Sequence, residues 1–302
     1  MTKRVAVAGS SGLIGGALCA RLRERGDEVV RLVRGRPGSP DEVSWTPGAG
    51  ELPLAALDGV DAIVNLAGAG IGDRRWDADY KRLVESSRVE STRTIAHALV
   101  RVAERTGRHI RFVNGSAVGF YGDRGDEVLT ERSEPGTDFL AGVVERWEAA
   151  THEARDAGIP AALVRTGLVM APSSGAFNPL LRLARLGLGG PLGTGRQWWP
   201  WITLADEAGI LEYLIDHPEI TGPVNAVAPM AARQSEIAAA LGQGLSRPAV
   251  LPAPRLALRA VVGEFADSIV ASQRVAPDRL LEAGFVFEHP DLETAVKWLL
   301  AQ

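Results

Sequence analysis

The sequence predicts an α/β fold: a doubly wound parallel sheet with helices on both faces, followed by a smaller, mostly helical C-terminal lobe. Three observations support this prediction. Short apolar runs alternate with helical patterns through the first two thirds of the 302 residues. Glycines spaced G-x-x-G-x-x-G directly follow the first apolar run. From about Phe177 the alternation weakens, and the patterns that remain are mostly helical.

The elements follow in chain order from these patterns. Strands are expected over residues 5–8, 28–34, 43–45, 62–66, 110–114 and 161–165. Helices are expected over 17–25, 78–105 and 139–157, and in the C-terminal part over 235–241, 255–262 and 292–300. The Pro-, Gly- and Ser-rich stretch 36–51 is expected to be mostly loop.

Two units are expected, a sheet domain over residues 1–175 and a substrate lobe over 176–302 that interleaves with the sheet. Ligands of such sheets bind outside the carboxyl ends of the strands. The loops that should carry function are therefore those after Ala8, Arg34, Leu66, Asn114 and Arg165.

The glycine motif has the spacing and the strand–turn–helix context of a dinucleotide phosphate site of the Rossmann type. Gly9 permits the tight turn, Gly12 lets backbone approach a pyrophosphate, and Gly15 lets the helix pack close to the strand. The phosphates would then meet free N–H groups at the helix N-terminus. A glycine turn without a ligand is the alternative. The expected contacts from this loop are Gly9, Ser10, Ser11, Gly12, Leu13, Ile14 and Gly15.

The end of the second strand distinguishes the two nicotinamide cofactors. A carboxylate there selects NAD by binding the ribose 2′-hydroxyl, whereas an arginine accommodates the 2′-phosphate of NADP. The sequence reads Arg31-Leu-Val-Arg34, without a carboxylate. Arg34 therefore favours NADP, unless the arginines here are simply a solvated strand end.

Composition excludes several other classes. A formal net charge of −4 without a dominant basic patch argues against a nucleic-acid partner. Cys19 is the single cysteine, which excludes a disulfide framework and fits a reducing, cytoplasmic environment. No leader or membrane-spanning run is expected. We expect a small-molecule substrate, a possible homodimer and no metal, because the five histidines lack ligand spacing: His97, His109, His152, His217 and His289.

Several motifs together resemble the extended short-chain dehydrogenase/reductase superfamily, and within it an atypical, epimerase-like family with its own C-terminal region. The motifs are Gly9-Ser-Ser-Gly-Leu-Ile-Gly15, Asn65-Leu-Ala-Gly-Ala-Gly-Ile71, Arg74-Arg-Trp76, Ser116-Ala-Val-Gly-Phe-Tyr-Gly122, Trp147-Glu148, Arg165-Thr-Gly167, Gly195-Arg-Gln-Trp198, Pro200-Trp-Ile202, Asn225-Ala-Val-Ala-Pro229 and Ser272-Gln-Arg-Val275. Further cofactor contacts are expected at the strand ends, from Leu66, Ala67, Gly68, Asn114, Thr166 and Gly167.

The resemblance implies hydride transfer assisted by a Ser or Thr and a Tyr-x-x-x-Lys dyad. Ser116 occupies the serine position, but the tyrosine and lysine positions fall on Phe139 and Val143. No Tyr-x-x-x-Lys exists in the chain, because Tyr80, Tyr121 and Tyr213 are followed four residues later by Val84, Gly125 and His217. The usual proton transfer is therefore impaired, rerouted or absent.

Two residues are candidates to replace the tyrosine. Tyr121, five residues after Ser116, would supply a phenol; alternatively it packs beside the cofactor. Without a cationic neighbour its pKa should stay near ~10, which makes it a poor base but leaves it a possible donor. Glu148 follows Trp147 and would be an acid with a raised pKa, or else a member of a structural ion pair or a cap.

Two clusters are expected on the substrate side. Arg74, Arg75 and Trp76 suit an anionic or planar substrate, with a plain surface turn as the alternative. Arg196 and Trp198 begin a second cluster, in which the neighbouring tryptophans either contact the ligand or form the core of the lobe.

The long helix and the segment after Pro200-Trp-Ile202 each add one expectation about the site. Arg88 and Thr92 lie one turn apart on the long helix, so they share a face that looks into the site or toward solvent. The histidine that the family usually carries after Pro200-Trp-Ile202 is Thr203 here.

Two functions of different class follow. The first is an NADP(H)-dependent oxidoreductase or epimerase-like enzyme in which Ser116 holds the reacting oxygen. The second is a catalytically silent NADPH-binding sensor or scaffold, which the missing dyad favours. A sugar-nucleotide epimerase in the usual sense is disfavoured, because it needs a proton relay in both directions.

Overall fold

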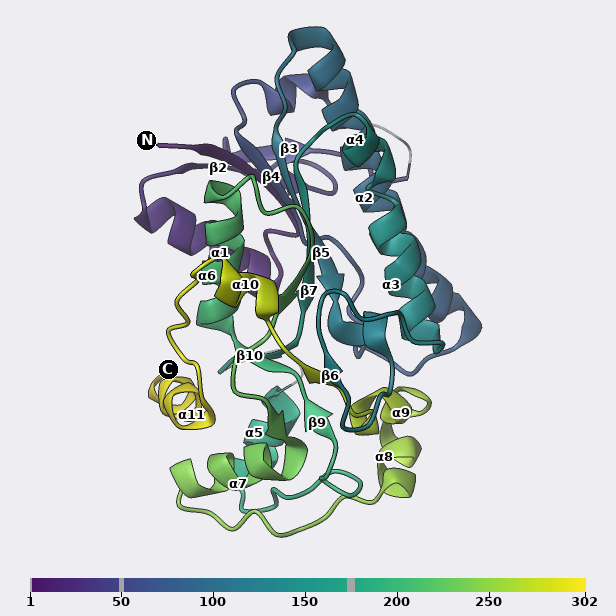
Figure 1. The fold of residues 1–302 in the computed structure, drawn as a ribbon, viewed down its shortest axis with the longest axis vertical. Helices are drawn as coiled ribbons and strands as arrows, with labels where there is room; N and C mark the ends of the chain where they lie inside the picture. Colours follow the sequence, from purple (N-terminus) through teal and green to yellow (C-terminus); the bar gives the residue numbers. More distant parts are fainter. Residues whose placement is uncertain (1, 49–51, 173–176) are drawn as a thin grey trace.

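A seven-stranded parallel sheet forms the centre of the molecule (Figure 1). The computed structural model describes residues 2–48, 52–172 and 177–302. The strand order is β11-β7-β5-β4-β1-β2-β3, and every pairing in it is parallel. The strands are β1 (Arg4–Ala8), β2 (Glu28–Val33), β3 (Glu42–Ser44), β4 (Ala62–Asn65), β5 (Arg111–Ala117), β7 (Ala161–Thr166) and β11 (Gly222–Ala226). The predicted doubly wound sheet is confirmed.

The central strands are apolar because both faces of the sheet are covered. All four residues of β4 and four of the five in β1 are buried. The strand order reverses between β1 and β4, since β2 and β3 extend to one side and β5, β7 and β11 to the other. The carboxyl ends of β1 and β4 therefore flank the switch point at which ligands bind in such sheets.

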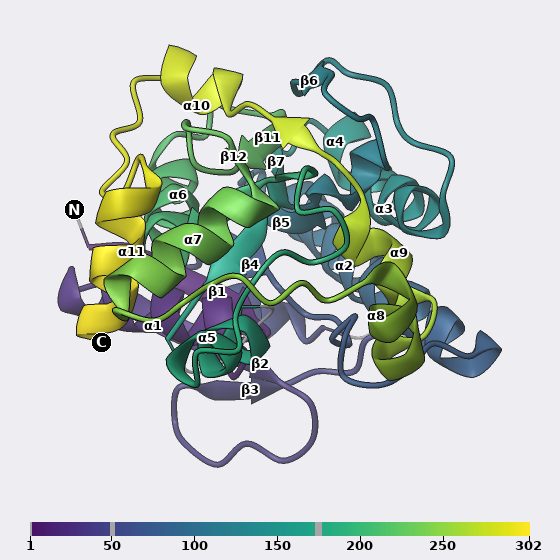
Figure 2. The ribbon, with the colours of Figure 1, turned by 90° about the horizontal axis from the view of Figure 1, so that it is seen from below.

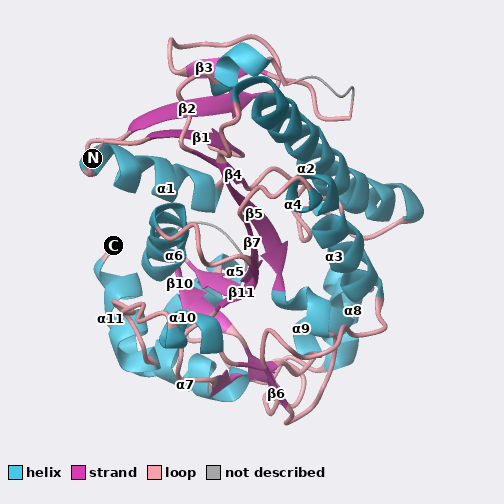
Figure 3. Cartoon of the chain, turned by 45° about the horizontal axis from the view of Figure 1, so that its top comes forward, coloured by secondary structure: helices cyan, strands magenta, loops and turns pink. Residues whose placement is uncertain are grey.

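Helices cover the two faces separately (Figure 3). α1 (Leu13–Glu24) and α6 (Leu204–Asp216) lie against one face and share one apolar core with it. The long helix α2 (Ala78–Thr106) packs on the other face through Ile95 and Leu99, with α3 (Phe139–Ala149) and α4 (His152–Asp156) beside it. The 3-10 turns η1 (Leu54–Leu57) and η2 (Val118–Tyr121) follow β3 and β5.

The C-terminal elements gather below the carboxyl edge of the sheet (Figure 2). Trp199 and Trp201 are buried there in a separate apolar cluster with Phe177, as the core interpretation of these tryptophans predicts. The helices are α5 (Asn178–Arg185), α7 (Gln234–Gly244), α8 (Arg255–Val262), α9 (Phe265–Val270), α10 (Asp278–Glu282) and α11 (Leu292–Ala301). Three small sheets pair β6 (Val128–Leu129) with β13 (Arg274–Val275), β8 (Leu168–Met170) with β10 (Trp201–Thr203), and β9 (Trp198–Trp199) with β12 (Ala232–Arg233).

Three differences from the predicted elements are informative. The helix expected over 139–157 is two helices, which break around the buried Thr151, whose hydroxyl donates to the Glu148 carbonyl. α6 and β11 were not predicted, yet both belong to the layers of the main sheet. The predicted boundary between residues 175 and 176 lies outside the described residues.

Candidate functional site

The glycine loop forms a cradle that side chains would fill. Gly9 has φ +80°, a conformation that L residues rarely adopt, and a Cβ there would come within 2.6 Å of the Leu66 carbonyl oxygen. A Cβ on Gly15 would collide with the Gly9 carbonyl. Gly12 is the N-cap of α1, and its N–H donates to the Gly9 carbonyl at 3.0 Å. The backbone turn therefore requires glycine at positions 9 and 15.

The N-terminus of α1 is free to bind an anion. The first N–H groups of a helix have no acceptor within the helix. No side chain caps α1, and its first turn holds no carboxylate. Nearby, just after β2, Arg34 is exposed, and its guanidinium has no hydrogen-bond or ion-pair partner among the described residues. Leu13, Ile14 and Gly15 thus present backbone donors at the switch point, and these residues fit a dinucleotide phosphate group.

A buried polar network ties the carboxyl ends of β4 and β5 together. The Asn65 side chain donates to Asn114 Oδ1 at 2.9 Å and to Thr92 Oγ1 at 3.0 Å, and Thr92 also donates to Asn114. Trp147 Nε1 donates to Thr92 at 3.0 Å. Asn114 is fully enclosed, and its amide donates to the Gly115 carbonyl. Asn114 was predicted as a cofactor contact. Its side chain instead forms hydrogen bonds within the protein, which position the end of β5.

A second buried chain begins at Ser116 on β5. The Ser116 hydroxyl donates to Glu148 Oε1 at 2.6 Å. Arg165 on β7 forms a bidentate pair with Glu148, through Nε at 2.8 Å and Nη2 at 2.9 Å. Burial lowers the pKa of Arg165, but its hydrogen bond and charge interaction with Glu148 outweigh burial and leave that pKa above its ordinary value. The ion-pair interpretation of Glu148 is the one the structure supports.

Tyr121 continues this chain and is fully enclosed. Its hydroxyl donates to Asn225 Oδ1 at 2.7 Å and accepts from Arg165 Nη1 at 3.0 Å. The expected pKa near ~10 assumed no cationic neighbour, yet Arg165 lies beside the phenol. Burial nevertheless dominates and raises the pKa of Tyr121 to about 12. The proton of this phenol is directed into the core and not toward a ligand.

The two positions expected for the dyad both lie on α3. Phe139 is half-buried, and its ring packs edge-on against Trp76 with centroids 5.3 Å apart. Val143 is buried among apolar side chains, with 2% of its surface exposed. Lys81 Nζ lies 5.2 Å from the Phe139 ring centroid, but it pairs with Glu264. Neither position offers a proton or a ribose ligand.

Arg75 and Trp76 contact two C-terminal helices, α8 and α9. Arg75 Nη2 donates to the Ala260 carbonyl of α8 at 2.7 Å. Trp76 packs against Phe265 of α9 with centroids 5.4 Å apart, and the Arg74 guanidinium lies 4.4 Å from the Tyr80 ring centroid. Arg75 and Trp76 thus contact α8 and α9, and Arg74 contacts Tyr80 of α2, so protein groups already engage all three predicted substrate contacts.

The predicted cluster at Trp198 is likewise engaged by protein. Arg233 and Arg274 lie over its ring at 4.4 and 4.7 Å, and its indole N–H donates to Asp126 at 2.6 Å. Arg196 is exposed, and its carbonyl accepts from Arg233. Only the Arg196 guanidinium is left for a ligand in this cluster.

A buried acid that the sequence prediction missed lies beside the predicted contact Thr166. Thr166 Oγ1 donates to Glu207 Oε1 at 2.7 Å, while Oε2 of this fully enclosed side chain has no partner. Burial raises the pKa of Glu207 to about 8. The only signal in the sequence is an acidic residue at the start of an apolar helix. Gly167, also predicted to contact the cofactor, lets the Pro200 backbone approach closely.

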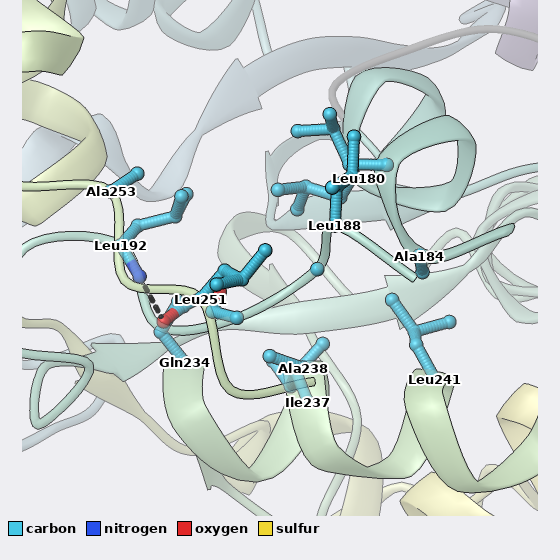
Figure 4. A pocket seen from close by; sticks show the side chains of 13 residues that line it. Leu180, Ala184, Leu188, Leu192, Gln234, Ile237, Ala238, Leu241, Leu251 and Ala253 are labelled. Carbon is cyan, nitrogen blue, oxygen red and sulfur yellow. Dashed lines mark hydrogen bonds between the residues drawn. The ribbon is translucent and has the colours of Figure 1, made fainter. Parts of the chain in front are cut away.

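A small apolar pocket lies apart from these groups, among α5, α7 and the loops beside them (Figure 4). Gln234 is its only polar lining side chain, and its Oε1 already accepts from the Leu192 N–H at 2.8 Å. Leu180, Ile237 and Leu241 are among the walls. With no free polar group, this pocket is not a place for chemistry.

The described residues contain neither a candidate metal site nor a helix that could span a membrane. Over residues 2–48, 52–172 and 177–302, no group of three His, Cys, Asp or Glu side chains is placed to hold a metal ion. Within the same ranges no helix is long and apolar enough to cross a membrane.

Comparisons with known proteins agree with this architecture. The model of the NAD dependent epimerase/dehydratase family matches residues 5–227, and a domain of unknown function, DUF1731, matches residues 253–299. An epimerase family protein of Mycobacterium bovis is 41% identical over 293 residues, which cover 97% of this chain and 96% of that protein. The human epimerase family protein SDR39U1 is 37% identical over 302 residues, 99% of this chain and 100% of its own length.

A solved structure of human SDR39U1 with NADPH superimposes with a TM-score of 0.88 at 33% identity, covering 99% of both chains. A structure described as a nucleoside-diphosphate sugar epimerase from Corynebacterium glutamicum has a TM-score of 0.81 at 36% identity and covers 99% of this chain and 58% of that one. MoeE5 with UDP-glucose and NAD is only 19% identical at a TM-score of 0.76, and so shows a shared fold alone.

Proposed function

Because the chain belongs to the NAD dependent epimerase/dehydratase family, we propose that it binds NADP(H) and transfers hydride to or from a small polar substrate. The observation that carries the proposal is the glycine cradle at the uncapped N-terminus of α1. NADPH is the group bound by the human relative that superimposes over 99% of the chain. The exposed Arg34, without a carboxylate beside it at the end of β2, suits the 2′-phosphate.

The cofactor supplies hydride exchange at the nicotinamide ring, and the residues of the chain must handle the oxygen and its proton. Ser116, near the carboxyl end of β5, is the residue that would contact the reacting oxygen. Its single proton is donated to Glu148 Oε1, and Glu148 pairs with Arg165. The Ser116 oxygen can therefore accept a hydrogen bond from a ligand but cannot at the same time donate one. This favours a bound hydroxyl over a bound carbonyl.

In the direction of alcohol oxidation the proton has one route through these residues. The substrate hydroxyl would give its proton to Ser116 Oγ while Ser116 gives its own to Glu148 Oε1. A nicotinamide, when bound, would supply the hydride acceptor for the same carbon. Protonation of Glu148 removes the charge that balances the buried Arg165. The relay is therefore costly, and we expect slow turnover. Tyr121 has no part in it, because its proton is bonded to Asn225.

A catalytically silent NADPH-binding protein is the second candidate. The observation that favours it is that α3 carries Phe139 and the buried Val143 at the two expected dyad positions. Under this alternative the cofactor binds and no carbonyl or alcohol turns over.

Titration with NADPH and NADH, followed by the fluorescence of the seven tryptophans, tests the cofactor assignment. We expect NADPH to bind at least about tenfold more tightly, or about 1.4 kcal/mol. In the Arg34→Ala variant this preference should disappear, while Arg36→Ala, two residues on, serves as the matched control. Failure of both cofactors to bind would overturn the proposal.

Turnover tests separate the two candidates. The oxidoreductase proposal expects slow reduction of NADP⁺ with some members of a panel of small polyols, lost in Ser116→Ala. Tight NADPH binding with no turnover in wild type supports the silent alternative.

A further inference from the structure

The chain contains one largely desolvated arginine whose hydrogen-bonding capacity is mostly unused. Arg88 lies on α2, where that helix meets α3 and the loop that follows β4. Its Nη1 donates to the carbonyls of Ala69 and Val84, both at 2.9 Å. The guanidinium also lies 5.2 Å from the ring centroid of Trp147. Nε and Nη2, with three N–H groups, have no partner among the described residues.

Two other buried arginines show what a structural role looks like in this molecule. Arg165 uses all three nitrogens, on Glu148 and the Tyr121 hydroxyl. Arg111 uses its three nitrogens on the carbonyls of Leu214, Pro218 and Ile220, at 2.7–3.2 Å. Arg88 uses one. No carboxylate among the described residues pairs with it, and its charge meets only two carbonyls and the Trp147 ring.

The free nitrogens of Arg88 remain in contact with solvent. In the described part of the chain, the side-chain atoms that are both enclosed and unbonded are Arg4 Nε and Glu207 Oε2, and neither belongs to Arg88. Gly68 helps to hold the guanidinium in place, because a Cβ there would lie 3.2 Å from Arg88 Cγ and 3.3 Å from Nη1. The unused donors are thus fixed beside the loop after β4 at the carboxyl edge of the sheet.

Burial lowers the pKa of Arg88 to about 10, so the group is still a cation at neutral pH. A half-buried cation without a carboxylate partner is only partly hydrated, which weakens the folded state. Groups with shifted pKa values cluster at functional sites. The planar fork of an arginine matches the two oxygens of a carboxylate or phosphate.

We propose that Arg88 binds an anionic group, a carboxylate or a phosphate, carried by the substrate. This inference rests on the proposed function and narrows its substrate class to small anionic molecules. A second source of the same chemistry is the diphosphate of the cofactor, which the N-terminus of α1 already serves. The two sources are distinguished by whether the cofactor and the anion bind together.

The test titrates inorganic phosphate and malonate into the protein at constant ionic strength, with and without saturating NADP⁺, and follows tryptophan fluorescence. We expect saturable binding of at least one anion, and its affinity should fall by at least about tenfold in Arg88→Met. Arg88→Lys keeps a point charge but loses the planar fork, so it should retain only part of the anion affinity. Binding that persists in the NADP⁺ complex assigns the anion to the substrate; binding abolished by NADP⁺ overturns that assignment.

The change in Tm on substitution distinguishes a ligand-binding arginine from a structural one. Arg88→Met should lower Tm less than a structural arginine would, because its loss of two carbonyl bonds is offset by removal of a cation without a carboxylate partner. The matched control Arg111→Met should lower Tm, because three carbonyls lose their donor, and should leave the anion titration unchanged.

The proposal is overturned if Arg88→Met loses stability as Arg111→Met does, or if its anion titration matches wild type. If Arg88→Met does not fold, Arg88→Gln is titrated instead, and failure of both to fold shows a structural guanidinium. Because the cofactor-free titration does not need NADPH to bind, failure of the proposed function is a separate outcome.

Discussion

The two halves of the carboxyl edge of the sheet are built differently. Around β1 and β2 the site is made of backbone: a glycine turn and a helix N-terminus without a capping side chain. Around β5 and β7 it is made of side chains that bond to one another, from Ser116 through Glu148 and Arg165 to Tyr121. The first half keeps its donors free for a ligand, whereas the second half satisfies most of its own polar groups.

This difference separates a half that can bind an anion from a half whose polar groups already bond to one another. Free N–H groups on a fixed turn bind an anion without any rearrangement. A buried ion pair, in contrast, holds its members in one protonation state, because a change leaves a charge without a partner. The Ser116 hydroxyl at the end of β5 donates to Glu148, and no described residue donates to its oxygen.

Breaking the ion pair should have the largest effect. Arg165→Met leaves the Glu148 carboxylate enclosed without its cation, and Glu148→Gln leaves the guanidinium without its anion. Each is expected to lower the free energy of unfolding by about 3–5 kcal/mol, measured by urea denaturation. The double variant Glu148→Met/Arg165→Met should lose much less than the sum. Additive losses would show that the pair does not act as a unit.

Filling the glycine cradle should have the next largest effect. In Gly15→Ala the new Cβ meets the Gly9 carbonyl, so the turn must shift, at a cost of about 1–3 kcal/mol in stability. NADPH affinity, measured by fluorescence titration, should fall with it. The matched control is Gly16→Ala, whose Cβ would have its nearest neighbour at 3.8 Å. Equal losses in both variants would contradict the cradle.

Removing one hydroxyl sharpens the role of Tyr121. Tyr121→Phe leaves Arg165 Nη1 and Asn225 Oδ1 each without one partner, which should cost about 1–3 kcal/mol in urea denaturation. Turnover per folded molecule should be unchanged, because the phenol proton faces the core. A variant with wild-type stability and no turnover would instead identify Tyr121 as the proton donor.

Glu207 should give the smallest effect, as a slope of stability with pH. Its pKa in the folded state, about 8, lies above its unfolded value of 4.5, so the folded protein holds the proton more tightly. The stabilising contribution is complete below pH 4.5 and is lost as pH rises toward 8. Between pH 7 and 8 the loss should not exceed about 1.4 kcal/mol. Glu207→Gln should flatten this profile, and an unchanged slope would exclude Glu207 as its cause.

Local pattern was enough to predict much of the fold and the cofactor half of the site. Strand and helix periods placed β1, β2, β4 and the long helix α2 within a few residues, and Gly9 and Gly15 are required where the motif has them. The pattern missed α6 and β11, because a strand that joins the sheet late in the chain has no local signal for its neighbour.

The sequence by itself determined the alternation of strands and helices, the glycine turn and the absence of a Tyr-x-x-x-Lys dyad, because each is a property of residues close together in the chain. Tertiary structure decided which polar groups are hydrogen-bonded within the protein and which have unused hydrogen-bonding capacity. The Tyr121 hydroxyl meets Asn225, 104 residues away, whereas Arg88 meets no carboxylate in the part of the chain that the structure describes. The role of a buried donor or charge depends on which partner it has. Only folding brings partners from distant segments together.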